Sequence, residues 1–367
     1  MITTSPNATA LRILSASDVD SVLADFTPAD HLALMARVFH GISHPPKSST
    51  AISHLQPHRT TLPLPNHTTL VMPARVPSLG SSVKLVSVPT AAGDTRGLPA
   101  STLVLDEATG TVRAVLNARS LTAVRTAAGT VLATVILHPP ASSPQMTHLA
   151  AFGAGAQIRA HVDLLLDLYP TLTHVTLVNR KPNPRVDNLI KYLSSAHPGV
   201  TFATNILSAD NLKATVQTAS IIVTATPSRS PLFPSIWVRP GTHLILVGSY
   251  TPAMVEIDSD LVLRAGRVVV DSRNACAAEA GELIAAGIPP EDVTEIGELV
   301  RPQADGGFDE WTVDEEGRAK VTAAGDVTIV KSVGVGAQDV AIAIAVAERA
   351  FSKGVGTVVE GYDAIVA

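Results

Sequence analysis

The chain has 367 residues, a length that favours two domains over one or four. Its 27 lysines and arginines against 32 aspartates and glutamates leave a formal charge of −5, which argues against a nucleic-acid binder that relies on bulk positive charge. The mean hydropathy is +0.28. Because no window approaches the ~18 uninterrupted apolar residues of a spanning helix, we assign the apolar excess to the core and expect no membrane partner.

The start of the chain and its cysteine content bear on compartment and chemistry. Residues 1–23 lack a basic segment followed by a long apolar stretch, so we expect a cytoplasmic protein. The single cysteine, Cys276, excludes an internal disulfide and a thiolate-rich metal site, and its Ala-rich surroundings are typical of a small buried thiol. The twelve histidines show neither HxH nor HExxH spacing, so we predict no metal.

The first part of the chain predicts two helices followed by an antiparallel or mixed sheet. The helical patterns cover residues 14–23 and 27–42, each with a Ser, Thr or Asp cap, and a Pro-, Ser- and His-rich loop is expected over 42–59. Strand-like runs cover residues 68–76, 81–88, 101–110 and 111–118. Ala-Thr-Gly-Thr between the last two runs predicts a hairpin. One long Ala-rich helix is predicted over 119–137.

From residue 146 onward, strand and helix patterns alternate. The strand patterns are 147–155, 173–180, 220–226, 242–248 and 267–271, and the helix patterns are 156–170 and 186–196. Their β-branched cores are continuous, as in a parallel sheet buried on both faces, and predict a doubly wound Rossmann α/β domain. The Gly- and acid-rich residues 302–324 predict a surface excursion. Residues 329–351 predict a strand and then an apolar helix that returns to the first domain.

A glycine pair lies between the first strand and helix of the alternating part. Gly153 and Gly155 would let the backbone approach a pyrophosphate at the helix start, so we expect residues Gly153, Ala154, Gly155, Ala156 and Gln157 to contact a dinucleotide. The third position of the fingerprint is Ile158, which departs from the strict pattern. A purely structural turn is the alternative.

The end of the second strand of this part predicts the cofactor. NAD-selective sites place a carboxylate there for the ribose hydroxyls, but this chain has Asn179, Arg180 and Lys181. Two cations can pair with a 2′-phosphate, so we expect NADP(H) to be preferred, with NAD(H) as the alternative. An ordinary solvated turn would also carry such residues.

Six blocks in order resemble the ornithine cyclodeaminase/mu-crystallin family over nearly the whole chain. They are residues 119–134, 151–161, 223–233, 247–258, 268–283 and 328–339. The resemblance implies a homodimer in which a substrate-binding and dimerisation domain, built from both chain ends, surrounds a Rossmann domain. Here that division is 1–125 with 335–367, and 126–334.

The resemblance also implies the substrate site. Arg59 corresponds to the arginine that holds the substrate carboxylate, Lys84 to the active-site lysine, and Arg125 to a second carboxylate ligand. Basic groups suit an acidic imino-acid or amino-acid substrate, although each of the three could instead be an ordinary surface charge. Among such cations, we expect the pKa of Lys84 to fall toward neutrality.

Further cofactor contacts follow from the same resemblance. They are Thr126, Thr224, Ala225, Thr226, Val247, Gly248, Ser249 and Val333. Most of them follow predicted strands, and the carboxyl ends of strands are where open α/β sheets bind ligands.

One loop separates the reactions known in this family. Its cyclodeaminases carry an aspartate shortly before a proline, where this chain reads Gly248-Ser249-Tyr250-Thr251-Pro252 with no carboxylate. We therefore expect an NADPH-dependent reductase of imino acids, such as 1-pyrroline-2-carboxylate or 1-piperideine-2-carboxylate, with Lys84 as proton donor. The alternatives are ornithine cyclodeaminase, an alanine-type amino-acid dehydrogenase, or a non-catalytic NADPH-dependent binder of small molecules.

Overall fold

The computed structural model describes residues 10–45, 55–77, 79–90 and 97–364, and the chain divides into two compact units. Unit 1 comprises residues 1–34, 45–125 and 335–367, and unit 2 comprises 35–44 and 126–334. Residues 35–44, expected in the first domain, belong to unit 2. Part of the expected 42–59 loop, residues 46–54, lies outside the described residues.

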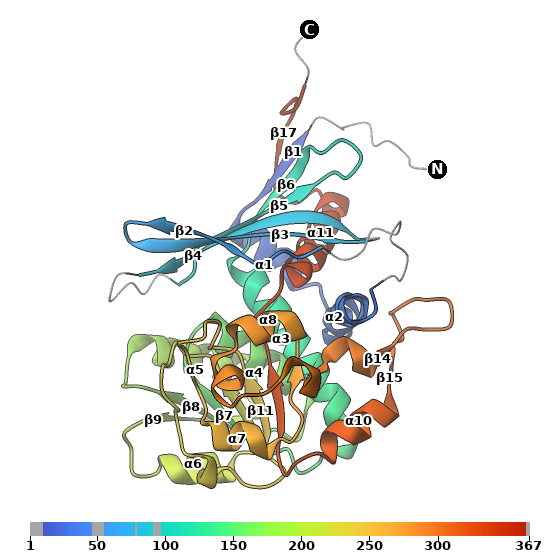
Figure 1. The fold of residues 1–367 in the computed structure, drawn as a ribbon. Coiled ribbons are helices and arrows are strands. Elements are labelled where there is room, and N and C mark those ends of the chain that lie inside the picture. Colours follow the sequence, from blue (N-terminus) through green and yellow to red (C-terminus); the bar gives the residue numbers. More distant parts are fainter. Residues whose placement is uncertain (1–9, 46–54, 78, 91–96, 365–367) are drawn as a thin grey trace. The chain divides into compact units, whose positions relative to one another are not determined.

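Unit 1 holds a mixed sheet of seven strands in the described part of the chain (Figure 1). The strands are β1 (Leu11–Leu14), β2 (Thr60–Leu64), β3 (His67–Val76), β4 (Gly80–Pro89), β5 (Ala100–Leu105), β6 (Val112–Asn117) and β17 (Thr357–Val359), in the order β17-β1-β6-β5-β4-β3-β2. β1 runs parallel to β6 and the other neighbours are antiparallel, which confirms the predicted mixed sheet and the β5–β6 hairpin. Helix α1 (Ala16–Leu23) precedes most of these strands, and helix α11 (Gly336–Lys353) packs on β3 and β4, as expected for the tail.

The strand register gives the unit 1 sheet two different faces. One cross-strand row consists of Met72, Lys84, Thr102, Leu116 and Leu14, all buried. The next row consists of Pro73, Val83, Leu103, Val115 and Ile13, all partly or largely exposed. Because side chains alternate along a strand, the two rows point to opposite faces. Lys84 therefore lies in the buried row.

Unit 2 is a doubly wound domain, which confirms the α/β class with a parallel sheet. Eight strands of the described residues are all parallel, in the order β13-β12-β16-β11-β10-β7-β8-β9. They are β7 (His148–Phe152), β8 (His174–Asn179), β9 (Thr201–Ile206), β10 (Ile221–Thr224), β11 (His243–Leu246), β12 (Val269–Val270), β13 (Thr294–Glu295) and β16 (Thr328–Lys331). The chain passes from β7 outward to β9 and then returns to β10 on the other side of β7. This reversal is the topological switch point at which such sheets bind ligands.

Helices flank the parallel sheet along the chain. They are α4 (Ala156–Leu168), α5 (Pro184–Ala196), α6 (Leu212–Thr218), α7 (Ser259–Arg264), α8 (Arg273–Glu279), α9 (Gly281–Ala285) and α10 (Glu315–Thr322). Two more, α2 (Pro28–Ser43) and α3 (Arg119–Leu137), run through the division between the units.

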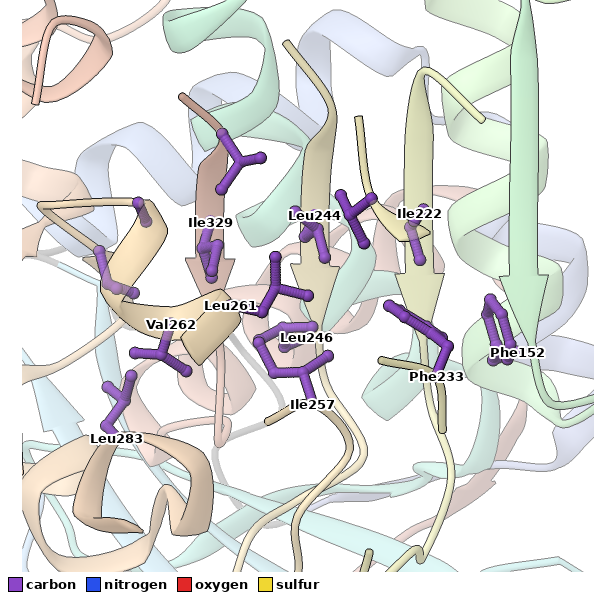
Figure 2. Close-up of a cluster of buried hydrophobic side chains, with 14 of the residues drawn as sticks. Phe152, Ile222, Phe233, Leu244, Leu246, Ile257, Leu261, Val262, Leu283 and Ile329 are labelled. Carbon is purple, nitrogen blue, oxygen red and sulfur yellow. The ribbon is translucent and has the colours of Figure 1, made fainter. Parts of the chain in front are cut away.

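The core of unit 2 lies along four adjacent strands. Figure 2 shows Phe152, Ile222, Leu244 and Ile329 on β7, β10, β11 and β16, with Leu261 of α7 beside them. All five side chains are fully buried. Burying one such side chain contributes about 1.5–3 kcal/mol, so this cluster fixes the strands whose ends carry the predicted cofactor loops.

Helix α3 has the length and hydropathy of a membrane-spanning helix, with a mean hydropathy of 1.5 over its apolar window. However, 78% of that window is buried inside the protein. Such burial is typical of a core helix.

The expected surface excursion contains regular structure. Strand β15 (Thr312–Val313) pairs with β14 (Val300–Arg301), and helix α10 follows. The helix exposes an i,i+4 pair between Glu316 and Lys320.

Candidate active site

Two of the predicted substrate residues in unit 1 contact the same buried carboxylate. Lys84 Nζ lies 2.7 Å from Asp339 Oδ2, and Arg125 Nε donates a 3.0 Å hydrogen bond to Asp339 Oδ1. Lys84 is 1% exposed, Arg125 3% and Asp339 2%. We call Lys84, Arg125 and Asp339 the cation cluster. Buried charges are rare unless paired, so this arrangement excludes the surface-charge alternative for Lys84 and Arg125.

The start of helix α11 holds the cluster in place. Arg125 Nη1 donates a 2.8 Å bond to Gln338 Oε1, and Gln338 Nε2 donates a 3.0 Å bond to the Arg125 carbonyl. Gly336 allows the close approach to β3, because a Cβ at this position would lie 2.9 Å from the Cβ of Ala74. The geometry of the helix start therefore places Asp339 next to Lys84.

The pKa of Lys84 is lowered to about 8, chiefly by burial and also by the charges of Arg125 and Arg59. Asp339 opposes them and raises it. The predicted direction agrees with the structure, but its main cause is burial rather than the neighbouring cations. Arg59 is half-buried just before β2.

Sequence reasoning assigned no role to Asp339 or Gln338. The signal was present as a Gln-Asp pair in the first turn of a helix, directly before the apolar run 340–347. A carboxylate on a buried helix face requires a cationic partner, but the sequence does not show which cation the fold brings to it.

In unit 2, the glycine pair begins helix α4 at the end of β7. Gly153 has φ +124°, and a Cβ there would lie 3.0 Å from the Ala225 carbonyl oxygen and 3.2 Å from Ile158 Cγ1. Gly155 is exposed, with open space where its Cβ would be. Within the described residues no side chain caps α4, and a helix start of this kind binds anions through its backbone N–H groups, which fits a dinucleotide pyrophosphate.

Ile158 explains why the departure from the glycine fingerprint is tolerated. Its side chain is fully buried and fills the space that the missing Cβ of Gly153 leaves free. Ala154, Ala156 and Gln157 lie at the same helix start, around the glycine pair.

The end of β8 presents the two predicted cations. Asn179 Oδ1 accepts a 2.7 Å bond from the Arg180 backbone N–H, and the Arg180 and Lys181 side chains are exposed. Helix α5 starts at Pro184 with Asn183 as its cap. No acidic residue occurs from residue 179 to residue 186, so a ribose 2′-phosphate would meet cations here.

The loops after β10 and β11 share one buried carboxylate, Glu256. Thr224 Oγ1 and the Gly248 N–H donate 2.8 and 2.7 Å bonds to Oε2. The N–H and Oγ1 of Thr226 each donate a 2.7 Å bond to Oε1. A Cβ at Gly248 would lie 2.2 Å from the Thr226 carbonyl oxygen, so this position requires glycine. Glu256 thus fixes the spacing of the two loops, in which Ala225 lies between Thr224 and Thr226 and Val247 precedes Gly248.

Two further buried networks hold the remaining predicted contacts. Ser249 Oγ donates to Glu282 and accepts a 2.7 Å bond from Lys331 Nζ. The N–H of Val333 donates a 3.0 Å bond to Asp271 Oδ2. Thr126 is buried at the start of the unit 2 part of α3.

The loop from Gly248 to Pro252 shows no substitute for the missing aspartate. The next carboxylate along the chain is Glu256, which is fully buried and already accepts four hydrogen bonds. Burial also raises its pKa. Glu256 is therefore a structural tie between loops rather than an available acid or base.

Within the described part of the chain, no group of three or more His, Cys, Asp or Glu residues could hold a metal ion. Cys276 is buried, and this burial raises the pKa of its thiol.

Comparison with known proteins agrees with this architecture. A profile of the ornithine cyclodeaminase/mu-crystallin family matches residues 51–354. The chain belongs to this family. Ketimine reductase mu-crystallin of Mus musculus is 31% identical over 252 residues, which cover 67% of this chain and 74% of that protein.

Two other proteins are similar to this chain in sequence or in fold. Delta(1)-pyrroline-2-carboxylate reductase of Paracoccus denitrificans is 34% identical over 217 residues, 57% of this chain and 65% of that protein. The structure of Thermococcus litoralis Delta(1)-pyrroline-2-carboxylate reductase, in complex with NADH and L-proline, aligns with a TM-score of 0.77 and 23% identity. This alignment covers 95% of this chain and 99% of that one. The resemblance predicted from the six sequence blocks is thus confirmed, and these relatives are oxidoreductases.

Proposed function

We propose that this protein is an NADPH-dependent reductase of imino acids, with cyclic ketimines such as 1-pyrroline-2-carboxylate and 1-piperideine-2-carboxylate as substrates. The cation cluster carries the proposal. Lys84 and Arg125 share the single negative charge of Asp339, and the charge of Arg59 also acts on Lys84. A substrate carboxylate would balance the excess positive charge.

The residues of unit 1 have separate tasks in this proposal. Arg59 and Arg125 hold the carboxylate and so orient the imine, while the Lys84 ammonium supplies the proton to the imine nitrogen. The carbon of an imine protonated at nitrogen is electrophilic enough to accept hydride. A pKa of about 8 leaves Lys84 mostly protonated at neutral pH and still able to release its proton.

The residues of unit 2 would hold the cofactor. The start of α4 would bind the pyrophosphate, and Arg180 and Lys181 would bind the 2′-phosphate. The loops that Glu256 joins would contact the rest of the dinucleotide. A bound nicotinamide would supply the hydride. Relatives named as ketimine and pyrroline-2-carboxylate reductases support the substrate class.

The deciding experiment distinguishes three possible outcomes for the purified protein. We expect NADPH absorbance to fall when either cyclic ketimine is added, and to fall more slowly with NADH. Release of ammonia from ornithine would instead make the protein a cyclodeaminase. Saturable ligand binding without any turnover would make it a binding protein.

A further inference from the structure

Asp339 contacts the two cations of the cation cluster with different oxygens. Oδ2 lies 2.7 Å from Lys84 Nζ, and Oδ1 accepts the hydrogen bond from Arg125 Nε. One carboxylate therefore fixes the spacing between an ammonium and a guanidinium. That spacing matters because the guanidinium must hold the substrate carboxylate while the ammonium lies within reach of the imine nitrogen.

The same carboxylate decides whether Lys84 can be charged where it lies. Lys84 is buried on β4, and charged groups reach it from three other segments: Asp339 on α11, Arg125 on α3 and Arg59 before β2. Burial and both arginines favour the neutral amine. Asp339 opposes all three effects.

We propose that Asp339 is the positioning residue of this site: it sets the spacing of the Lys84 ammonium and the Arg125 guanidinium and keeps Lys84 protonated at neutral pH. The proposal rests on the proposed function for the identity of the substrate. It adds a residue that acts through Lys84 and that never transfers a proton to the substrate itself.

The first test is the pH dependence of kcat with a cyclic ketimine and NADPH. Asp339→Asn keeps the shape of the side chain but removes its charge. Activity falls as rising pH removes the Lys84 proton, so we expect this alkaline limb to move down by about one to three pH units in the variant. Asp339→Glu keeps the charge and should return the limb toward its original position. An unchanged limb in Asp339→Asn would overturn the proposal.

A second measurement does not depend on turnover. Side-chain carbon NMR of isotope-labelled lysine follows the titration of Lys84, with Lys84→Met to assign its resonance. A titration at lower pH in Asp339→Asn supports the positioning role even if the protein reduces no imine, in which case the proposed function alone fails. If the protein reduces imines but Lys84 titrates at the same pH in Asp339→Asn, the positioning role of Asp339 is rejected and the proposed function stands.

A second pair of variants tests the proposal if Asp339→Asn does not fold. In its double variant, one buried cation and one buried carboxylate are removed together. Arg125→Gln removes one buried cation, and adding Asp339→Asn then also removes the carboxylate. We expect Lys84 to titrate at lower pH in the double variant than in Arg125→Gln. Equal titrations would contradict the proposal.

Discussion

His161 and Thr130 join helix α4 to helix α3, with His161 Nε2 and Thr130 Oγ1 lying 2.8 Å apart and both residues fully buried. His161 Nδ1 lies 2.7 Å from the Gln157 carbonyl oxygen, which can only accept, so Nδ1 carries a proton. In the neutral ring, Nε2 then accepts from the Thr130 hydroxyl. Burial lowers the pKa of His161 to about 4, so the folded protein keeps this ring neutral.

The first prediction concerns stability in acid. Between about pH 6.5 and pH 4 the unfolded chain binds a proton at His161 that the folded chain does not, so the stabilisation is full above pH 6.5 and is lost as the pH falls. As the pH falls from 7 to 5, we expect protonation of His161 in the unfolded chain to lower the free energy of unfolding by about 2 kcal/mol. The free energy of unfolding of His161→Gln, measured in urea, should depend less on pH than that of the unaltered protein. The matched control, His58→Gln, changes an exposed histidine, and equal pH dependence in both variants would contradict the prediction.

The second prediction separates proton donation from substrate binding. Lys84→Met should lower kcat by roughly 10²–10⁴-fold, the usual size of general acid catalysis. Arg59→Met should instead mainly raise KM for the carboxylate substrate. Steady-state kinetics with a cyclic ketimine and NADPH measure both effects, with the exposed Lys320→Met as control. Near-normal turnover of Lys84→Met from about pH 6 to pH 9 would mean that water or another group donates the proton.

The third prediction concerns cofactor choice. NADPH should have a lower KM than NADH, and Arg180→Ala should narrow the difference by roughly tenfold, because a guanidinium–phosphate contact contributes about 1.5–3 kcal/mol. Lys213→Ala removes an exposed cation from α6 and should leave the ratio unchanged. If the unaltered protein uses both cofactors equally well, Arg180 and Lys181 do not select the cofactor.

The fourth prediction is a homodimer formed through unit 1. The row containing Val83 and Leu103 leaves apolar side chains partly exposed on the sheet face opposite Lys84, and a second copy would cover them. Light scattering should give twice the chain mass of 38.1 kDa at micromolar concentration. Leu103→Glu should shift the mass toward 38.1 kDa, whereas Leu263→Glu, on the exposed side of α7, should not. A monomeric unaltered protein would refute the dimer.

Local patterns predicted the fold well where each residue's environment follows from its neighbours in sequence. The β-branched runs at 220–226 and 242–248 became the buried strands β10 and β11, and the glycine pair marked the start of α4. Residues 35–44 were misassigned because α2 is one continuous helix. Its periodicity indicates a helix but not which unit buries each turn.

Pairing between distant segments could not be predicted in this way. Asp339 is 214 residues from Arg125, and no local spacing relates the two. Glu256 carries no local signal either, because its four donors lie at the end of β10 and in the loops after β10 and β11, which only the assembled sheet brings together. Resemblance to a family located the cations, but only the structure showed the carboxylate that they share.

Building unit 1 from both chain ends also sets an order of assembly during synthesis. Strand β4 and Arg125 leave the ribosome long before helix α11, which is made after the whole of unit 2. Until Asp339 emerges, Lys84 lacks this carboxylate, and helix α11 does not yet cover β3 and β4. The nascent chain can thus complete its Rossmann unit first, and the charged centre of unit 1 closes only after helix α11 has been translated.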